Sequence, residues 1–451
     1  MGLLEKVLKS TVFVTTSSYI TLITSLLGFL ILVLIVSPEE YGSYVLAISF
    51  VYAATGLIGF GAAPLVISEL TQKLENEDLS FVYNFIKSHI KVNISSSVVL
   101  AALFLSSPTL FPEQLGGISN LMFVSGAMIV SEVVRRIVGQ IFLIQAKFEE
   151  KSFLDITNSI LRLIILTILV YFYNFGAFGG IASFVIAGVV SSFLSLRGIM
   201  EFFKKVSKYG DDGKSMYWEI MLKRGKYLAI SSQLKNLSDQ APIWLIAYYF
   251  GTVEVAMFSV ALKIMDPIKL FLSSLEIVSL PMINQAIVKS KEQASRLYFS
   301  FSKMGLYLAL SSGTVAYFLI PFAIELIFPG EYTESIPLFK LMLPLLALVG
   351  LGVSQRSLLN SLGMQKTFVK DYFLSLAIFI LSFMVLAPTF GIYGVAISFV
   401  MQRMVVLYRE YRIINLMGKK KFLDIFLPTK EDFLVAKRAK DLVLAKITSL
   451  R

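Results

Sequence analysis

Long runs of apolar residues, separated by short polar segments, recur along all 451 residues of the chain. A run of about 20 apolar residues is long enough for an α-helix to cross the hydrocarbon core of a bilayer. The pattern predicts an all-α polytopic membrane protein with twelve transmembrane helices. The predicted spans are 11–36, 42–69, 90–110, 117–146, 153–173, 180–203, 222–250, 253–286, 297–328, 338–363, 368–387 and 391–415.

Lysine and arginine are confined to alternate connecting segments. Every second loop contains neither residue: 37–43, 105–119, 172–180, 250–254, 329–337 and 387–393. Cytoplasmic loops of membrane proteins hold the excess of these cations. The alternation therefore requires an even number of spans. It predicts a multi-pass protein of the cytoplasmic (inner) membrane with both termini in the cytoplasm.

The two halves of the chain are related by a repeat with an offset of 214–215 residues. Glu40 aligns with Glu254, and the segment 180–182 aligns with 394–396 at the same offset. Six spans per copy is an even number, so the two lobes are predicted to be related by a pseudo-twofold axis along the membrane normal. The predicted domains are an N-terminal six-helix lobe (1–203), a cytoplasmic linker (204–221), a C-terminal six-helix lobe (222–417) and a basic amphipathic cytoplasmic tail (418–451).

The composition excludes several classes of protein. Only 16% of the residues are charged and 56% are hydrophobic, whereas a soluble domain has about 25% charged residues. There is no cysteine, so disulfides and thiol catalysis are excluded. No phosphate-binding glycine loop, catalytic triad or metal-ligand spacing occurs, so we predict neither an enzyme nor a resident cofactor or metal. The pattern of 430–448 predicts either an amphipathic helix or a solvated extension. The predicted partner of this basic tail is the bilayer, and not nucleic acid.

Nine of the 41 lysines and arginines lie inside the predicted spans. A cation at the centre of a bilayer costs at least about 2.5–3.5 kcal/mol, so such residues usually face a bundle interior or a wet cavity. The cations outnumber the acids in these spans, which predicts a basic pocket within the membrane. The nine are Arg135, Arg136, Arg162, Lys235, Lys263, Lys269, Lys340, Arg356 and Arg403.

The predicted fourth span contains the first candidate binding group. Glu132, Arg136 and Gln140 share one helical face, and Arg135 lies beside it. Glu132 neutralises one guanidinium, so the second needs a carboxylate on another helix, a phosphate or water. Because arginine holds phosphate in a bidentate fork, a phosphorylated ligand is one interpretation. Snorkelling of the pair toward the cytoplasm is the other.

The seventh span has an unusually polar face that includes Lys235 and Asp239. These two residues can form an ion pair at i, i+4. The pair either braces two helices or lines a central cavity, in which Asp239 would titrate or coordinate a cation.

In the eighth span, Lys263 lies near the membrane midplane and precedes Asp266 and Pro267, where a kink is expected. Arg403 has a similar depth, and Arg356 lies closer to the cytoplasm. The predicted substrate-binding residues are therefore Arg135, Arg136, Lys235, Asp239, Lys263, Asp266, Arg356 and Arg403. Lys269 is a weaker candidate. Arg162 is interpreted as a helix-packing residue, and Lys340 as a residue near the outer end of its span that snorkels.

Three segments resemble the polysaccharide-transporter family, the O-antigen type flippases of the multidrug/oligosaccharidyl-lipid/polysaccharide exporter superfamily. The most specific is Val36-Ser37-Pro38-Glu39-Glu40-Tyr41-Gly42-Ser43-Tyr44, which follows the first apolar run. The others are the segment from Asp239 to 263, with its Tyr-Tyr-Phe-Gly at 248–251, and the Tyr-Gly-Val-Ala at 393–396. One departure is that the first span lacks the basic residues of related cell-wall precursor flippases. Its polar residues include Thr15, Thr16, Ser17, Ser18 and Tyr19.

The resemblance implies two rocking six-helix lobes and the transfer of a polyprenyl-diphosphate-linked oligosaccharide to the outer leaflet. It implies an ion gradient (H⁺ or Na⁺), membrane potential or substrate gradient as the driving force, and glycan-assembly enzymes as partners. A cation-coupled multidrug exporter of the same architecture is one alternative. A non-transporting scaffold of an envelope-polysaccharide assembly is the other.

Overall fold

The computed structural model describes residues 3–58, 63–110, 118–210, 216–328, 330–355, 358–359, 362 and 364–418. All regular secondary structure in these ranges is helical, which confirms the all-α class. Arg356 and the predicted tail helix at 430–448 lie outside the described residues.

Seven helices in the described ranges are long and apolar enough to cross a membrane. This number confirms a multi-pass membrane protein, and the total of twelve spans stays a prediction. Four predicted spans are each divided between two shorter helices: 42–69, where one helix ends at Leu57 and the next begins at Ala63; 180–203, at Ser195; 253–286, between Ile264 and Asp266; and 338–363, near Pro344. The seven helices are Phe13–Ile35, Leu79–Thr109, Phe148–Phe172, Gly176–Leu194, Lys291–Ile327, Lys366–Phe390 and Ile392–Asn415.

The chain divides into two compact units, Met1–Ala247 with Gly251–Ala256, and Tyr248–Phe250 with Met257–Arg451. Helix α11 (Lys226–Tyr249) thus belongs almost entirely to the first unit. The lobe boundaries predicted at 203 and 222 stay a prediction.

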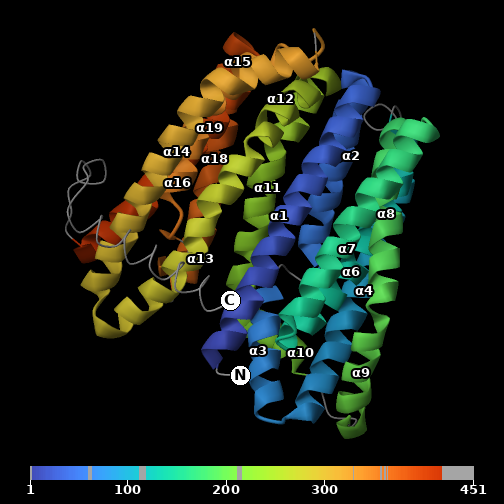
Figure 1. The fold of residues 1–451 in the computed structure, drawn as a ribbon, viewed down its shortest axis with the longest axis vertical. Helices are drawn as coiled ribbons and strands as arrows, with labels where there is room; N and C mark the ends of the chain where they lie inside the picture. Colours follow the sequence, from blue (N-terminus) through green and yellow to red (C-terminus); the bar gives the residue numbers. More distant parts are fainter. Residues whose placement is uncertain are drawn as a thin grey trace. The chain divides into compact units, whose positions relative to one another are not determined.

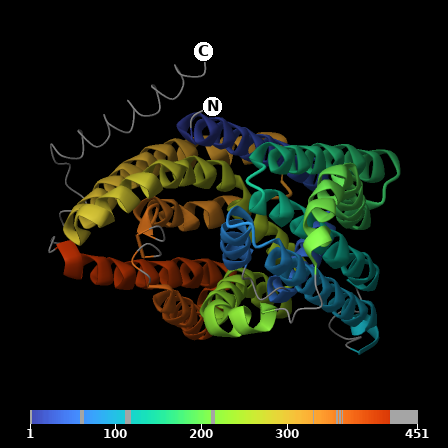
Figure 2. The same cartoon turned by 90° about the horizontal axis from the view of Figure 1, so that it is seen from below.

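In the first unit, the central helix α6 packs against α2, α4 and α8, while α7 packs against α1 and α8. These helices are coloured blue to green in Figure 1, and Figure 2 shows them from below. Their bounds are α1 (Leu3–Ile35), α2 (Pro38–Leu57), α3 (Ala63–Glu75), α4 (Leu79–Leu110), α6 (Ser119–Ile144), α7 (Phe148–Thr167), α8 (Gly176–Leu194), α9 (Leu196–Val206) and α10 (Tyr217–Ile220).

The Ser-Pro-Glu-Glu segment forms the start of α2 and ties it to α8. The Ser37 hydroxyl accepts a hydrogen bond from the Glu40 backbone N–H (3.2 Å), and Pro38 occupies the first helical turn, as expected for an N-terminal cap. The Glu40 carboxylate accepts the backbone N–H of Ala177 at 2.7 Å. Gly176 has φ +48°, and a Cβ there would collide with the Glu40 carboxylate. The motif therefore has a structural role in this chain.

The linker is attached to α4 by an aromatic contact. The side chain of Tyr217 is completely buried, and its ring lies 5.1 Å from that of Phe85 and 5.8 Å from that of His89. Burial raises the pKa of Tyr217 to about 12, because a phenolate would lose its hydration. The tyrosine therefore packs as a neutral side chain at physiological pH.

The second unit is built on two close helix pairs, α18 with α19 and α13 with α14, and α16 packs on α14. The Ser290 hydroxyl caps α14 by accepting the backbone N–H of Gln293 at 3.0 Å. The bounds are α12 (Thr252–Ile264), α13 (Asp266–Lys289), α14 (Lys291–Ile327), α15 (Ser335–Met342), α16 (Pro344–Leu351), α18 (Gln365–Phe390) and α19 (Ile392–Gly418).

Backbone-to-backbone contact at two glycines sets the approach of α14 to α16. A Cβ on Gly305 would lie 2.2 Å from the carbonyl oxygen of Gly350, and a Cβ on Gly350 would lie 2.3 Å from that of Gly305. No side chain fits at either position unless the helices separate. Small residues serve the same purpose in many membrane helix pairs.

We predict that Gly305→Ala destabilises the protein by about 1–3 kcal/mol, the usual cost of overpacking. Gly313→Ala on the same helix is the matched control, because its Cβ would meet only the Leu346 side chain at 3.9 Å. That control should be neutral or stabilised by about 0.5–1 kcal/mol, since alanine favours helix. Thermal unfolding of the two detergent-purified variants measures the difference, and equal midpoints would contradict the close contact.

The absence of cysteine permits a direct test of the predicted orientation. Thr333 and Lys208 are both exposed, the first in a loop without cations and the second in the basic linker. In intact cells, a membrane-impermeant maleimide should label Thr333→Cys and leave Lys208→Cys unlabelled until the cells are permeabilised. The reverse labelling pattern would invert the predicted topology.

Candidate functional site

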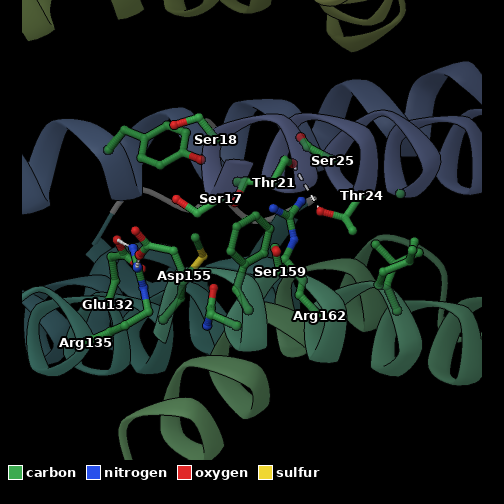
Figure 3. Close-up of a pocket in the computed structure, with 17 residues that line it drawn as sticks. Ser17, Ser18, Thr21, Thr24, Ser25, Glu132, Arg135, Asp155, Ser159 and Arg162 are labelled. Carbon is green, nitrogen blue, oxygen red and sulfur yellow. Dashed lines mark hydrogen bonds and ion pairs between the residues drawn. The ribbon is translucent and has the colours of Figure 1, made fainter. Parts of the chain in front are cut away.

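A polar cavity of about 440 Å³ lies within the first unit. Its residues come mainly from α1, α6 and α7 (Figure 3). Hydroxyl groups from α1 form one wall. This helix contains the first predicted span, in which the sequence offered hydroxyl-bearing residues in place of basic ones. Ser18 and Thr24 each donate their hydroxyl proton to a backbone carbonyl of α1 at 2.9 Å, so their oxygen lone pairs remain available. The hydroxyl-bearing residues of this wall are Ser17, Ser18, Thr21, Thr24 and Ser25.

Four charged residues beside the cavity form a balanced network. Arg135 contacts Glu132 at 2.6 Å and Asp155 at 3.3 Å. Lys151 forms a further ion pair with Asp155, one helical turn away. Two cations and two carboxylates neutralise one another. Arg135, a predicted anion ligand, thus lines the cavity with both neighbouring carboxylates engaged.

Arg162 also lines this cavity (Figure 3), and its charge is balanced differently. Its guanidinium stacks 3.5 Å from the ring centroid of Phe184 and hydrogen-bonds the Tyr44 hydroxyl. In the described part of the chain, no carboxylate lies within 4.0 Å of it. Cation–π contact holds a guanidinium in place without cancelling its charge. From the sequence, Arg162 is interpreted as a helix-packing residue. Its spacing from Asp155 and Asn158 on α7 indicates the shared face that lines the cavity.

The predicted polar face of α6 makes two separate contacts. The Arg136 guanidinium donates to the backbone carbonyl of Thr55 at 3.0 Å and is not among the residues that line the cavity. Gln140 pairs with the ring of His89 at 2.9 Å. Arg136 and Gln140 therefore connect α6 to α2 and α4, and only Glu132 of this face reaches the cavity.

The polar face of α11 contacts α2. The predicted ion pair between Lys235 and Asp239 is present at 2.5 Å. Two residues before Lys235, the Gln233 amide donates to the backbone carbonyl of Gly56. Farther along, the Trp244 indole N–H donates to the Ser49 hydroxyl at 2.9 Å. The side chains of Gln233 and Trp244 therefore join α11 to α2 within the first unit.

The second unit contains a cationic cluster at the break between α12 and α13. The Asp266 carboxylate lies 3.1 Å from the Lys263 ammonium group and 3.4 Å from that of Lys269. Two lysines thus share one aspartate, and the trio has a net positive charge. Pro267 occupies the first turn of α13, at the predicted interruption of the helix. Lys269 also lines a cavity of about 380 Å³, together with Arg403.

The structure therefore brings together Lys263 and Asp266, adds Lys269, and places Arg403 on the same cavity as Lys269. This cavity also contains the carboxylates of Glu276 and Glu410 and an apolar wall. Whether the cations of the first and second units line one pathway stays a prediction.

Residues 7–286, more than half of the chain, match the sequence profile of a family described as polysaccharide biosynthesis protein. The chain belongs to this family. The matched range contains the first unit from α1 onward and extends into α13 of the second. No curated protein matches the chain.

Solved transporters share the fold of this chain. An inward-facing multidrug resistance MATE transporter of the MOP superfamily superposes with a TM-score of 0.74 at 15% identity, over 89% of this chain and 96% of that chain. The Vibrio cholerae MATE transporter VcmN gives 0.65 at 17% identity, over 94% and 98% of the two chains. A Pyrococcus furiosus MOP transporter, described as having a binding pocket of reverse polarity, gives 0.66 at 15% identity over 92% and 97%. These likenesses establish that the chain has a MATE-type fold.

The attachment of α11 to α2 can be tested with the two tryptophans of the chain. We predict that Trp244→Phe costs about 1 kcal/mol, the net value of one hydrogen bond, because phenylalanine keeps the ring stacking with Phe50 (5.5 Å). Trp218→Phe is the control, since 48% of Trp218 is exposed. Thermal unfolding of both variants in detergent measures the effect, and equal destabilisation would contradict a specific role for the Ser49 contact.

Proposed function

We propose that this protein moves a polyprenyl-diphosphate-linked oligosaccharide from the cytoplasmic to the outer leaflet of the inner membrane by alternating access. The observation that carries the proposal is the positive charge that direct ion pairs leave unbalanced among the described residues of each unit. It comprises the two lysines that share Asp266 and the Arg162 guanidinium on a polar cavity. Membership of a polysaccharide biosynthesis family and a transporter fold support it.

A diphosphate matches this distribution of charge. Each buried cation costs about 2.5–3.5 kcal/mol or more within a membrane, and an anionic ligand offsets that cost. Arginine binds phosphate oxygens through parallel N–H donors, while lysine acts as a point charge. The hydroxyl-lined wall of the first-unit cavity is suited to hydrated sugar residues. The polyprenyl chain remains in the lipid beside the bundle.

Export of cationic drugs is the chief alternative, because solved relatives of this fold include multidrug transporters. A cation needs available carboxylates, but Glu132 and Asp155 in the first-unit cavity are each engaged by Arg135, and Asp155 also by Lys151. The charge pattern of the first-unit cavity therefore disfavours a cationic cargo. The driving force in this proposal is a gradient of H⁺, Na⁺ or substrate, or the membrane potential, and glycan-assembly enzymes supply the cargo on the cytoplasmic side.

We predict that Arg162→Gln and Lys269→Gln each weaken binding of a polyprenyl-diphosphate glycan about 10- to 100-fold, the loss expected when a hydrogen bond to a charged group is removed. Arg162→Lys should retain part of the affinity because it keeps the charge. Lys340→Gln is the control, since Lys340 contacts the Tyr317 ring (4.8 Å) and lines neither of the two cavities. Binding is measured with the full chain in nanodiscs, and surface glycan is measured in cells lacking the native gene.

Two results would overturn the proposal. One is full restoration of surface glycan by the double variant Arg162→Gln, Lys269→Gln at normal protein level. The other is tight binding of the cationic dye ethidium by the wild type with no binding of the diphosphate lipid, which would favour the multidrug exporter. Surface glycan restored without any transfer of lipid-linked glycan in proteoliposomes would favour the scaffold alternative.

A further inference from the structure

A second polar cavity of the first unit, about 390 Å³ in volume, lies where α2, α6 and α8 begin. We call it the outer pocket and define it by Glu39, Ser43, Asn120, Phe175 and Phe178, all of which line it. Its walls come from three segments, at 37–43, 118–121 and 175–178. These segments lie in or next to predicted outer loops that contain no lysine or arginine.

The aromatic wall of the outer pocket has a defined backbone conformation. Phe175 lies between Asn174 (φ +55°) and Gly176 (φ +48°), two residues in the left-handed region. The hydrogen bond from the Ala177 N–H to the Glu40 carboxylate (2.7 Å) attaches this turn to α2. The Phe175 and Phe178 rings meet edge to face, with centroids 6.4 Å apart. The rings are therefore presented on a braced turn.

The polar wall has hydrogen-bonding capacity that the described residues do not use. Within the described ranges, the side chains of Glu39, Ser43 and Asn120 have no hydrogen bond or ion pair. Glu39 and Asn120 are exposed and Ser43 is half-buried. Glu39 lies in the first turn of α2, where a negative charge interacts favourably with the helix dipole. Its carboxylate oxygens remain free to accept hydrogen bonds.

We propose that the outer pocket binds uncharged pyranose units of a glycan. Sugar hydroxyls donate to a carboxylate and exchange hydrogen bonds with an amide and a hydroxyl, while the apolar C–H face of the ring packs on phenylalanine. The volume is within the 300–1,000 Å³ range of small-molecule sites. Among the described residues, Glu39 and Glu40 line the pocket and no lysine or arginine does, so the pocket disfavours acidic sugars.

This inference deepens the proposed function, because it places a glycan subsite on the side where the cargo is released. Within that scheme, the diphosphate is attracted to the buried cations and the sugar chain to the outer pocket. The two parts of the cargo therefore interact with groups of opposite charge. The outer pocket would then select among glycans that are attached to the same carrier lipid.

The test uses the full chain in nanodiscs and two soluble probes, maltotriose as a neutral glycan and trigalacturonate as an acidic one. Saturation-transfer NMR should show maltotriose binding to the wild type and no trigalacturonate binding. Glu39→Gln and Phe178→Leu should each weaken maltotriose binding about tenfold, the loss expected of one charge-assisted hydrogen bond or one aromatic contact. Glu334→Gln is the matched control, since Glu334 is an exposed carboxylate in another loop without cations.

Three outcomes would overturn the inference: no maltotriose binding by the wild type, equal binding of the acidic probe, or equal binding by Glu39→Gln and the wild type. Each is independent of the test of the proposed function. If Arg162→Gln abolishes diphosphate-lipid binding while the Glu39 and Phe178 variants bind maltotriose normally, the outer pocket fails as a glycan subsite and the flippase proposal stands. Loss of maltotriose binding in Glu39→Gln, with trigalacturonate binding gained, would support a charge-selective subsite.

Discussion

The cost of holding charged side chains among apolar helices governs the rest of this structure. Water is scarce within a bundle, so each cation needs a carboxylate, a carbonyl, an aromatic face or a ligand. The chain uses all three protein solutions. Arg135 contacts two carboxylates, Arg136 donates to the Thr55 carbonyl, and Arg162 stacks on Phe184. Only the carboxylate contacts neutralise the charge of the cation. A guanidinium held by a carbonyl or an aromatic face keeps its charge and can attract an anion.

Helix interruptions and close contacts position these groups. Pro267, in the first turn of α13, marks the break at which Lys263, Asp266 and Lys269 converge. In the first unit, the Glu40 carboxylate holds the turn before α8 and thereby shapes the outer pocket. A family motif with a structural role thus builds the wall of a candidate binding site. The structural role of Glu40 and the binding role proposed for Glu39 belong to adjacent residues, since Glu40 is engaged and Glu39 is free within the described ranges.

Much of the local chemistry could be predicted because helical spacing determines it. The pairs Lys235–Asp239 and Lys263–Asp266 are three or four residues apart, and both are present. The total of twelve spans is not established, because charged and broken helices resemble surface helices when judged by length and apolarity alone. Arg162 was interpreted as packing, since its aromatic partner Phe184 lies on another helix and no spacing rule relates the two.

The sequence by itself determined the all-α class, the multi-pass character and the ion pairs within single helices, because apolar run length and the 3.6-residue period suffice for these. For the pair Arg135 and Arg136 it left three possible partners beyond Glu132, namely a carboxylate on another helix, a phosphate or water. Only the tertiary structure decided that Asp155 on α7 is that carboxylate and that Arg162 has none within 4.0 Å among the described residues. It alone assembled the outer pocket from three separated turns. The physical reason is that charge compensation depends on distances between side chains on different helices, and packing sets those distances.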